Sequence, residues 1–195
     1  MTDYFALLDQ PRRPWLDSDA LKEVFQRKTL REHPDAQASA AGTGDAEAAF
    51  ALINTAHQSL QDPKLRLQHL LALEGHAPTS RFEAVPEEIA DLFPAIAAVT
   101  QDATQLAEKT ANAASALSRS LLAGEVMDVR NRIETLLATL IRLHAEADAK
   151  LEQLSAGYQS NAETLSAIHR LYIRYSYLRR WIAQLEEQRV GIADR

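Results

Sequence analysis

The sequence predicts an all-α protein, and three observations support that prediction. Residues that favour helices, above all Ala, Leu, Glu, Gln and Arg, are abundant, whereas glycine occurs only 6 times in 195 residues. Apolar residues recur at spacings of three and four along most of the chain, which is the period of an amphipathic helix. The alternation of apolar and polar residues that is typical of a half-buried strand is not visible.

Composition and charge exclude several classes of function. The net charge of −6 and the pI of about 5.5 argue against a nucleic-acid binder, whose footprint is basic. Cysteine is absent, which excludes disulfides, zinc fingers and thiolate ligation of iron–sulfur clusters. The six histidines show no metal-ligand spacing, and no nucleophile–base set or phosphate loop stands out. We therefore expect no resident metal, no cofactor and no enzymatic activity.

The sequence also gives expectations about localisation. No apolar run approaches the roughly 20 residues that a membrane-spanning helix needs. The first residues lack the charged leader and apolar core of a signal peptide. These features predict a cytoplasmic protein that does not contact membranes.

The N-terminal part is organised around a proline-containing corner, His33-Pro34-Asp35. Pro34 disfavours helical backbone in the residue before it and lacks a backbone donor, so the preceding helix should end near Glu32. The Asp35 side chain can bond the local backbone and set a turn. Apolar periodicity and capping residues predict four helices in this part, over about 4–8, 18–32, 45–61 and 63–75.

The C-terminal part predicts an elongated antiparallel three-helix bundle over residues 86–195, after a linker at 76–85. Its long helices are expected to end at Ala123-Gly124 and near Gly157, where glycine interrupts the pattern. Pro94 lies inside the first of these helices. It is expected to kink that helix or to split off a short helix at its start.

Three motifs at matching distances resemble the J-domain, the module by which DnaJ-type co-chaperones stimulate DnaK-type (heat-shock protein 70) chaperones. They are Asp3-Tyr4-Phe5-Ala6-Leu7-Leu8, His33-Pro34-Asp35 and Ile53-Asn54-Thr55-Ala56-His57-Gln58-Ser59-Leu60-Gln61-Asp62-Pro63. The resemblance implies an antiparallel helical hairpin with short flanking helices, and it assigns residues 1–75 to this domain.

Among J-domain proteins, the chain is most similar to the HscB family, the co-chaperones of iron–sulfur cluster assembly. That family also appends a helical bundle directly, without zinc fingers or a glycine-rich linker. Tyr177-Leu178-Arg179 and Gln184-Leu185-Glu186-Glu187 are similar to the end of HscB sequences. The resemblance implies that the protein stimulates a DnaK/HscA-type chaperone and delivers the iron–sulfur scaffold protein as its client through the bundle.

The resemblance also implies which residues meet the chaperone. The corner presents a carboxylate to the ATPase domain, and cations on one side of the second helix meet an acidic patch. A solvated surface helix is the alternative for those cations. The implied residues are His33, Pro34 and Asp35 in the corner and Lys22, Arg27 and Arg31 on the helix.

An apolar patch at the start of the bundle is implied to hold the scaffold protein. Its members are Leu92, Phe93 and Ile96, with Tyr177 from the last helix. The alternative is that these residues belong to the core of the bundle. An aromatic and basic cluster runs from Tyr172 to Trp181. Three interpretations stay open for it: packing against a client or the J-domain, core plus rim, or stacking on nucleic acid.

Two other functions stay open from the sequence. One is a J-domain protein with a different client, because the bundle surface resembles HscB mainly in architecture. The other is a helical interaction module that no longer stimulates a chaperone.

Overall fold

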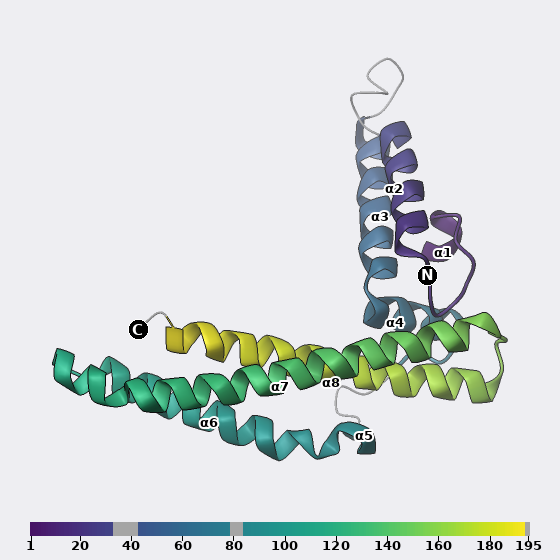
Figure 1. Ribbon diagram of the computed structural model, residues 1–195. Helices are drawn as coiled ribbons and strands as arrows, with labels where there is room; N and C mark the ends of the chain where they lie inside the picture. Colours follow the sequence, from purple (N-terminus) through teal and green to yellow (C-terminus); the bar gives the residue numbers. More distant parts are fainter. Residues whose placement is uncertain (33–42, 79–83, 194–195) are drawn as a thin grey trace. The chain divides into compact units, whose positions relative to one another are not determined.

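Helices and their connections make up the described part of the chain. The computed structural model describes residues 1–32, 43–78 and 84–193, and these ranges contain helices, turns and loops but no strand (Figure 1). Contacts divide the chain into two compact units. The first is Met1–Phe82 with Asp148–Tyr172, and the second is Glu83–Ala147 with Ile173–Arg195. The predicted all-α fold class is confirmed.

A pair of antiparallel helices gives the first unit its core. α2 (Ser18–Glu32) and α3 (Thr43–Gln61) pack side by side (Figure 1). Asp17 caps α2, because its Oδ1 accepts hydrogen bonds from the backbone N–H groups of Asp19 at 2.9 Å and Ala20 at 3.0 Å. Leu21 is buried on α2 and Ile53 on α3. The predicted hairpin, the start of its first helix and the end at Glu32 are confirmed.

Two shorter helices pack against α3 at the base of this hairpin. α1 (Tyr4–Leu7) is capped by Asp3, whose Oδ1 accepts from the N–H groups of Phe5 and Ala6. α4 (Pro63–Leu73) begins with a proline, whose missing N–H costs nothing in the first turn. Gly75 follows α4 with φ +75°, a backbone conformation that favours glycine. These features match the flanking helices predicted from the sequence.

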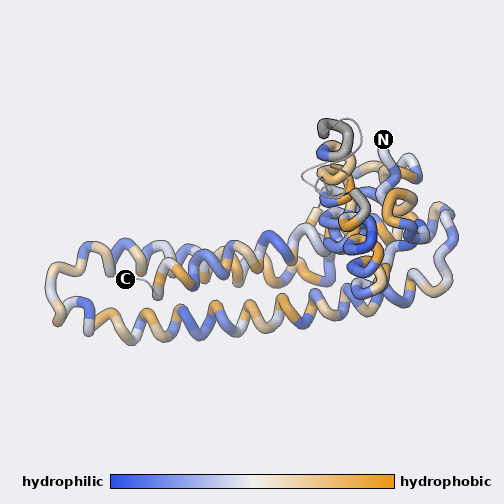
Figure 2. Tube along the Cα trace, turned by 90° about the horizontal axis from the view of Figure 1, so that it is seen from above, coloured by the Kyte–Doolittle hydropathy of each residue, from blue (hydrophilic) through white to orange (hydrophobic). Residues whose placement is uncertain are grey.

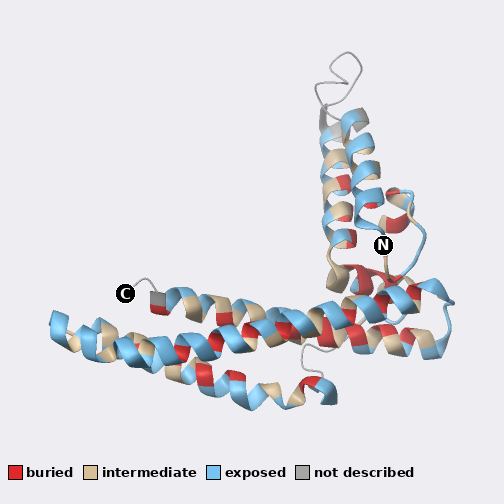
Figure 3. Ribbon diagram, viewed as in Figure 1, coloured by how far each residue is buried: buried red, intermediate tan, exposed pale blue. Residues whose placement is uncertain are grey.

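The second unit is built from three long helices. It contains α5 (Glu87–Ala90), α6 (Leu92–Ala111), the first part of α7 (Ala116–Ala156) and the last part of α8 (Ala162–Ala193). Hydrophobic and hydrophilic residues interchange along each helix (Figure 2), and buried positions recur along each helix (Figure 3). The core includes Ile96, Val99 and Leu106 of α6, Ile133, Leu137 and Leu140 of α7, and Leu178, Trp181 and Leu185 of α8.

One boundary between the compact units, after Phe82, falls inside the predicted linker at 76–85, but the rest of the chain does not form a single unit. Residues 148–172, at the end of α7 and the start of α8, belong to the same unit as the N-terminal helices. Two polar contacts show why. The Ser155 hydroxyl donates to the carbonyl of Trp15 at 3.3 Å, and the Ser160 hydroxyl bonds the Glu74 carboxylate. The bundle helices therefore contribute to both units, which local composition does not reveal.

The first break in the bundle lies at a different place from the predicted one. α6 ends at Ala111 and α7 begins at Ala116, whereas α7 runs through Gly124 without interruption. Ser115 explains the start of α7, because its hydroxyl accepts from the N–H of Ser118 at 3.0 Å. A glycine in a helix interior costs roughly 1 kcal/mol relative to alanine, which the remaining contacts of a 41-residue helix offset. The predicted helix end at Ala123-Gly124 is therefore wrong.

Pro94 has the predicted effect. A short helix, α5, ends at Ala90, and α6 begins anew at Leu92. Pro94 therefore falls in the first turn of α6, where its missing N–H has no partner to lose.

Candidate functional sites

The proline-containing corner lies outside the described residues. His33, Pro34 and Asp35 fall in the range 33–42, and the side chain of Arg31 is not described either. The structure describes the helices on both sides of the corner. α2 ends at Glu32, just before the corner in sequence, and α3 begins at Thr43.

The outward face of α2 differs from the sequence prediction. Lys22 and Arg27 are both exposed. Because they are five residues apart, they lie about 140° apart around the helix axis. They flank the outward face of α2 instead of sharing one side of it. Leu30 projects from this face with 75 % of its surface exposed. Leu30 is absent from the predicted contact residues. The available signal is that Leu21, Val24 and Phe25 form an apolar stripe at helical spacing and that Leu30 lies outside it.

Two contacts fix α2 in the first unit. The Lys28 ammonium pairs with the Asp9 carboxylate at 3.0 Å, so this cation ties α2 to the turn after α1. Phe25 of α2 stacks on His57 of α3, with ring centroids 4.0 Å apart. Burial lowers the pKa of His57, which keeps the stacked ring neutral over a wider pH range. Lys28 thus has a partner within the fold, whereas Lys22 and Arg27 are exposed to solvent.

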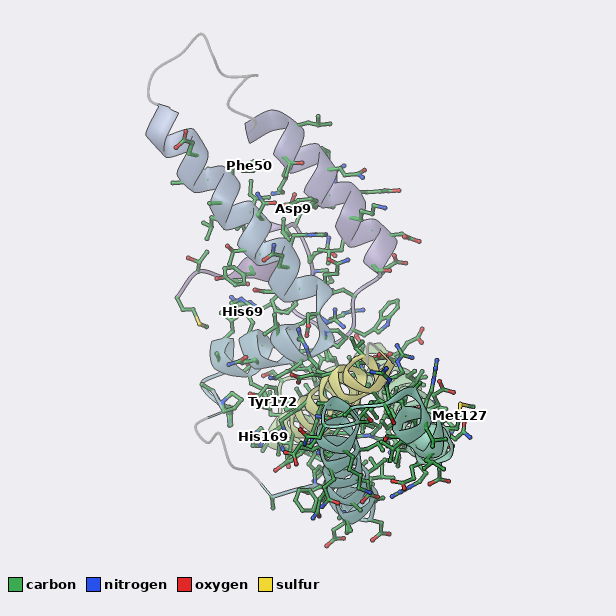
Figure 4. The ribbon with its side chains drawn as sticks, turned by 90° about the vertical axis from the view of Figure 1, so that its left-hand side faces the viewer. Asp9, Phe50, His69, Met127, His169 and Tyr172 are labelled. Atoms are coloured by element: carbon green, nitrogen blue, oxygen red, sulfur yellow. The ribbon has the colours of Figure 1, made fainter. Side chains whose placement is uncertain are left out.

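A buried polar cluster holds the base of the hairpin. His69 of α4 (labelled in Figure 4) is 8 % exposed. Its Nε2 accepts the backbone N–H of Tyr4 at 3.0 Å. Its ring stacks on Tyr4 and Phe5, with centroids 4.3 and 5.8 Å apart. Arg66 is buried and donates to the carbonyls of Pro14 at 2.7 Å and Leu60 at 2.5 Å. These two α4 side chains join the N-terminal segment to the α3–α4 turn.

The predicted apolar patch of the second unit is partly surface and partly core. Phe93 is 53 % exposed, and Leu92 and Tyr177 are half-buried against the core. Ile96 is only 2 % exposed and belongs to the core itself. Of the two alternatives given from the sequence, client surface or bundle core, Ile96 therefore fits the core. It lies three residues beyond Phe93, on the inner side of α6, so helical spacing alone does not separate the two.

Helix geometry places Phe93 and Tyr177 on one seam between α6 and α8. The Gln184 side-chain amide donates to the Thr100 hydroxyl at 3.0 Å, which fixes the register of these two helices. Seven residues make about two helical turns. Residues seven positions closer to the start of each helix therefore lie on the same face as Thr100 and Gln184. A step of seven leads from Thr100 to Phe93 and from Gln184 to Tyr177. The exposed phenylalanine and the half-buried tyrosine therefore belong to one surface.

The aromatic and basic cluster of α8 is core plus rim. Tyr175, Trp181 and Arg174 are buried, and Arg174 donates to the carbonyl of Leu143 at 3.0 Å. Burial of Tyr175 and Trp181 removes the faces on which nucleic-acid bases would stack. The rim is Tyr177 with Arg180, whose guanidinium carbon lies 4.7 Å from the centroid of the tyrosine ring.

The comparisons with known proteins agree with this geometry. Residues 3–69 match the family model of the DnaJ domain. The fold is similar to that of chaperone HscB from Vibrio cholerae, with a TM-score of 0.51 and 21 % identity, over 95 % of this chain and 96 % of that one. It is also similar to human co-chaperone protein HscB, with a TM-score of 0.57 and 16 % identity, over 97 % of this chain and 83 % of that one.

The resemblance inferred from the sequence is confirmed for the DnaJ domain and for the HscB fold. The N-terminal helices match a DnaJ domain, and the fold of nearly the whole chain is that of HscB structures. Within the described ranges, no helix combines the length and apolar character needed to cross a membrane. In the same ranges, no group of three histidine or acidic side chains is arranged to hold a metal ion.

Proposed function

We propose that this protein is a J-domain co-chaperone that stimulates the ATPase of a DnaK/HscA-type chaperone. The DnaJ-domain match over residues 3–69 carries this proposal. The hairpin that supports the corner is formed by α2 and α3, and its base is fixed by buried polar contacts. The protein supplies no catalytic group of its own in this proposal. It changes the rate at which its partner hydrolyses ATP.

The proposed chaperone contact combines the corner with the outward face of α2. Asp35 offers a carboxylate to a cationic surface of the partner, where a charge-assisted hydrogen bond gives strength and geometry. Lys22, Arg27 and Arg31 favour an acidic partner surface, and complementary charges of this kind mainly raise the association rate. Leu30 adds exposed apolar area on the outward face of α2, between Lys22 and Arg27 around the helix axis. A contact that is tighter in one nucleotide state shifts the partner toward that state.

The proposed client is the iron–sulfur scaffold protein, bound at Leu92, Phe93 and Tyr177. The fold shared with HscB structures supports this choice over nearly the whole chain. The surface is compatible with this choice, because the exposed Phe93 adjoins Leu92 and shares the seam with Tyr177, both of which are only half-buried. The scaffold protein would bring the cluster cysteines, so the absence of cysteine here is compatible with the role.

An ATPase assay with a cognate DnaK-type chaperone tests the chaperone-directed part. We expect the wild-type protein to raise the steady-state hydrolysis rate, and we expect Asp35→Asn and His33→Gln to lose at least about nine-tenths of that increase, since each removes a charge-assisted or oriented contact. Glu47→Gln, on the exposed surface of α3, is the matched control. Equal stimulation by wild type and both corner variants would contradict the proposal, and no stimulation at all would favour a helical interaction module.

A further inference from the structure

Arg180 is an exposed cation at the edge of the proposed client surface. Its guanidinium lies over the ring of Tyr177, 4.7 Å from the ring centroid. Tyr177 in turn packs against the core and against Trp181, with ring centroids 5.5 Å apart. The cation is therefore held by a ring that is itself fixed. Among the described residues, no carboxylate pairs with Arg180.

An arginine that stacks on an aromatic ring is preorganised to bind an anion. The ring covers one face of the guanidinium, while the N–H groups around its edge remain available to bond a carboxylate in its plane. Because the side chain is already ordered by stacking, less conformational entropy is lost when a carboxylate binds. The protein as a whole carries a net charge of −6, so Arg180 places a local cation on the surface of an acidic protein.

The seam between α6 and α8 carries apolar side chains beside Arg180. Tyr177 and Phe93 occupy equivalent positions on α8 and α6, two turns from the Thr100–Gln184 hydrogen bond. Asp91 is the acidic residue nearest to Phe93 along the chain. It precedes the first residue of α6, in the turn between α5 and α6.

We propose that the client segment that docks on this seam carries an acidic side chain next to an apolar one. The apolar side chain packs against Phe93 and Tyr177, and the carboxylate pairs with Arg180. This inference rests on the proposed client function and specifies the chemistry of its partner. The charge-assisted pair fixes the register of the docked segment, whereas the apolar contact gives most of the buried area.

Equilibrium binding of the full-length chain to purified iron–sulfur scaffold protein tests the inference. Arg180→Glu should weaken binding by about tenfold or more, and Arg180→Lys by less, because lysine keeps the charge but loses the planar stacking and the paired N–H groups. Raising the salt concentration should weaken wild-type binding more than Arg180→Glu binding. Glu88→Lys, an exposed change on α5, should leave binding equal or slightly tighter.

The outcomes separate this inference from the function on which it rests. If Phe93→Ser abolishes binding but Arg180→Glu does not change it, the client site stands and the acidic partner is wrong. If Arg180→Glu tightens binding and Glu88→Lys weakens it, the client segment is basic and the inference is overturned. If the wild-type chain does not bind the scaffold protein, the client function and the inference both fail. Thermal unfolding of each variant shows whether it is folded.

Discussion

At the scale of single residues, His69 makes the first unit sensitive to acid. Burial lowers the pKa of His69 from its usual value of 6.5, the nearby Asp3 carboxylate opposes that change, and the Arg12 guanidinium adds to it. Protonation of Nε2 would also break the hydrogen bond from the N–H of Tyr4. Because the pKa is lower in the folded state than in the unfolded state, the stabilisation is full above about pH 6.5 and is lost as the pH falls below it.

The prediction is that the melting temperature falls between about pH 7.5 and pH 5.5, and that His69→Gln reduces this fall. At the higher pH the variant should cost about 1 kcal/mol, the value of one buried hydrogen bond. His57 has a lowered pKa for the same reason and stays in both proteins, so the difference between them isolates His69. Equal falls in the two proteins would show that His69 does not titrate on unfolding.

The residue scale also marks a limit of sequence reasoning. Helical spacing places Lys28 on α2, but it does not say which residue Lys28 contacts. Its Asp9 partner, 3.0 Å away, comes from the turn after α1 and has no local signature. Ile96 and Phe93 are both apolar and three residues apart, yet one is buried and the other is exposed. Which apolar residue faces solvent depends on where the neighbouring helices lie.

At the scale of elements, two glycines give opposite predictions. Gly124 lies inside α7, and an added Cβ would meet nothing within 4 Å. Gly124→Ala should therefore raise the free energy of unfolding by about 0.5–1 kcal/mol. Gly75 has equal space around it, but its φ of +75° strains any other residue. Gly75→Ala should lower the free energy of unfolding by about 1 kcal/mol.

Urea unfolding of both variants, followed by circular dichroism, measures these changes. The two variants share the same added methyl group, so the contrast isolates backbone conformation. If both variants were stabilised, or both destabilised, the backbone conformation described for one of these two glycines would be wrong.

Element boundaries are predictable where a cap or a proline marks them. Asp17 begins α2, Pro63 begins α4, and the Pro94 region splits α5 from α6, as expected from the sequence. The break between α6 and α7 is not predicted, because the prediction gives a lone glycine more weight than the Ser115 cap. A helix tolerates a glycine in its interior at a modest cost. A hydroxyl that accepts hydrogen bonds from the first backbone N–H groups, in contrast, specifies where a helix begins.

At the scale of the whole molecule, one chain has two proposed tasks. In the proposed function, the corner and α2 would act on the chaperone, and the seam of Phe93 and Tyr177 would present the client. The motifs for the first task lie within about 60 residues of sequence, which is why the amino-acid pattern alone carries the resemblance. The seam joins residues 84 positions apart, and from the sequence only the resemblance to the HscB family groups Phe93 with Tyr177. Residues 148–172 belong to the unit of the N-terminal helices, which local pattern does not predict.

The measurement that tests the central claim most directly is the ATPase rate of a DnaK/HscA-type chaperone with this protein, with the iron–sulfur scaffold protein, and with both together. We predict that the rate with both exceeds the sum of the two separate increases, because one chain engages chaperone and client at once. Phe93→Ser should keep the stimulation by the chain alone and lose the excess, and Asp35→Asn should lose both. A rate with both proteins that is no higher than the sum, or an excess that survives Asp35→Asn, would contradict the claim.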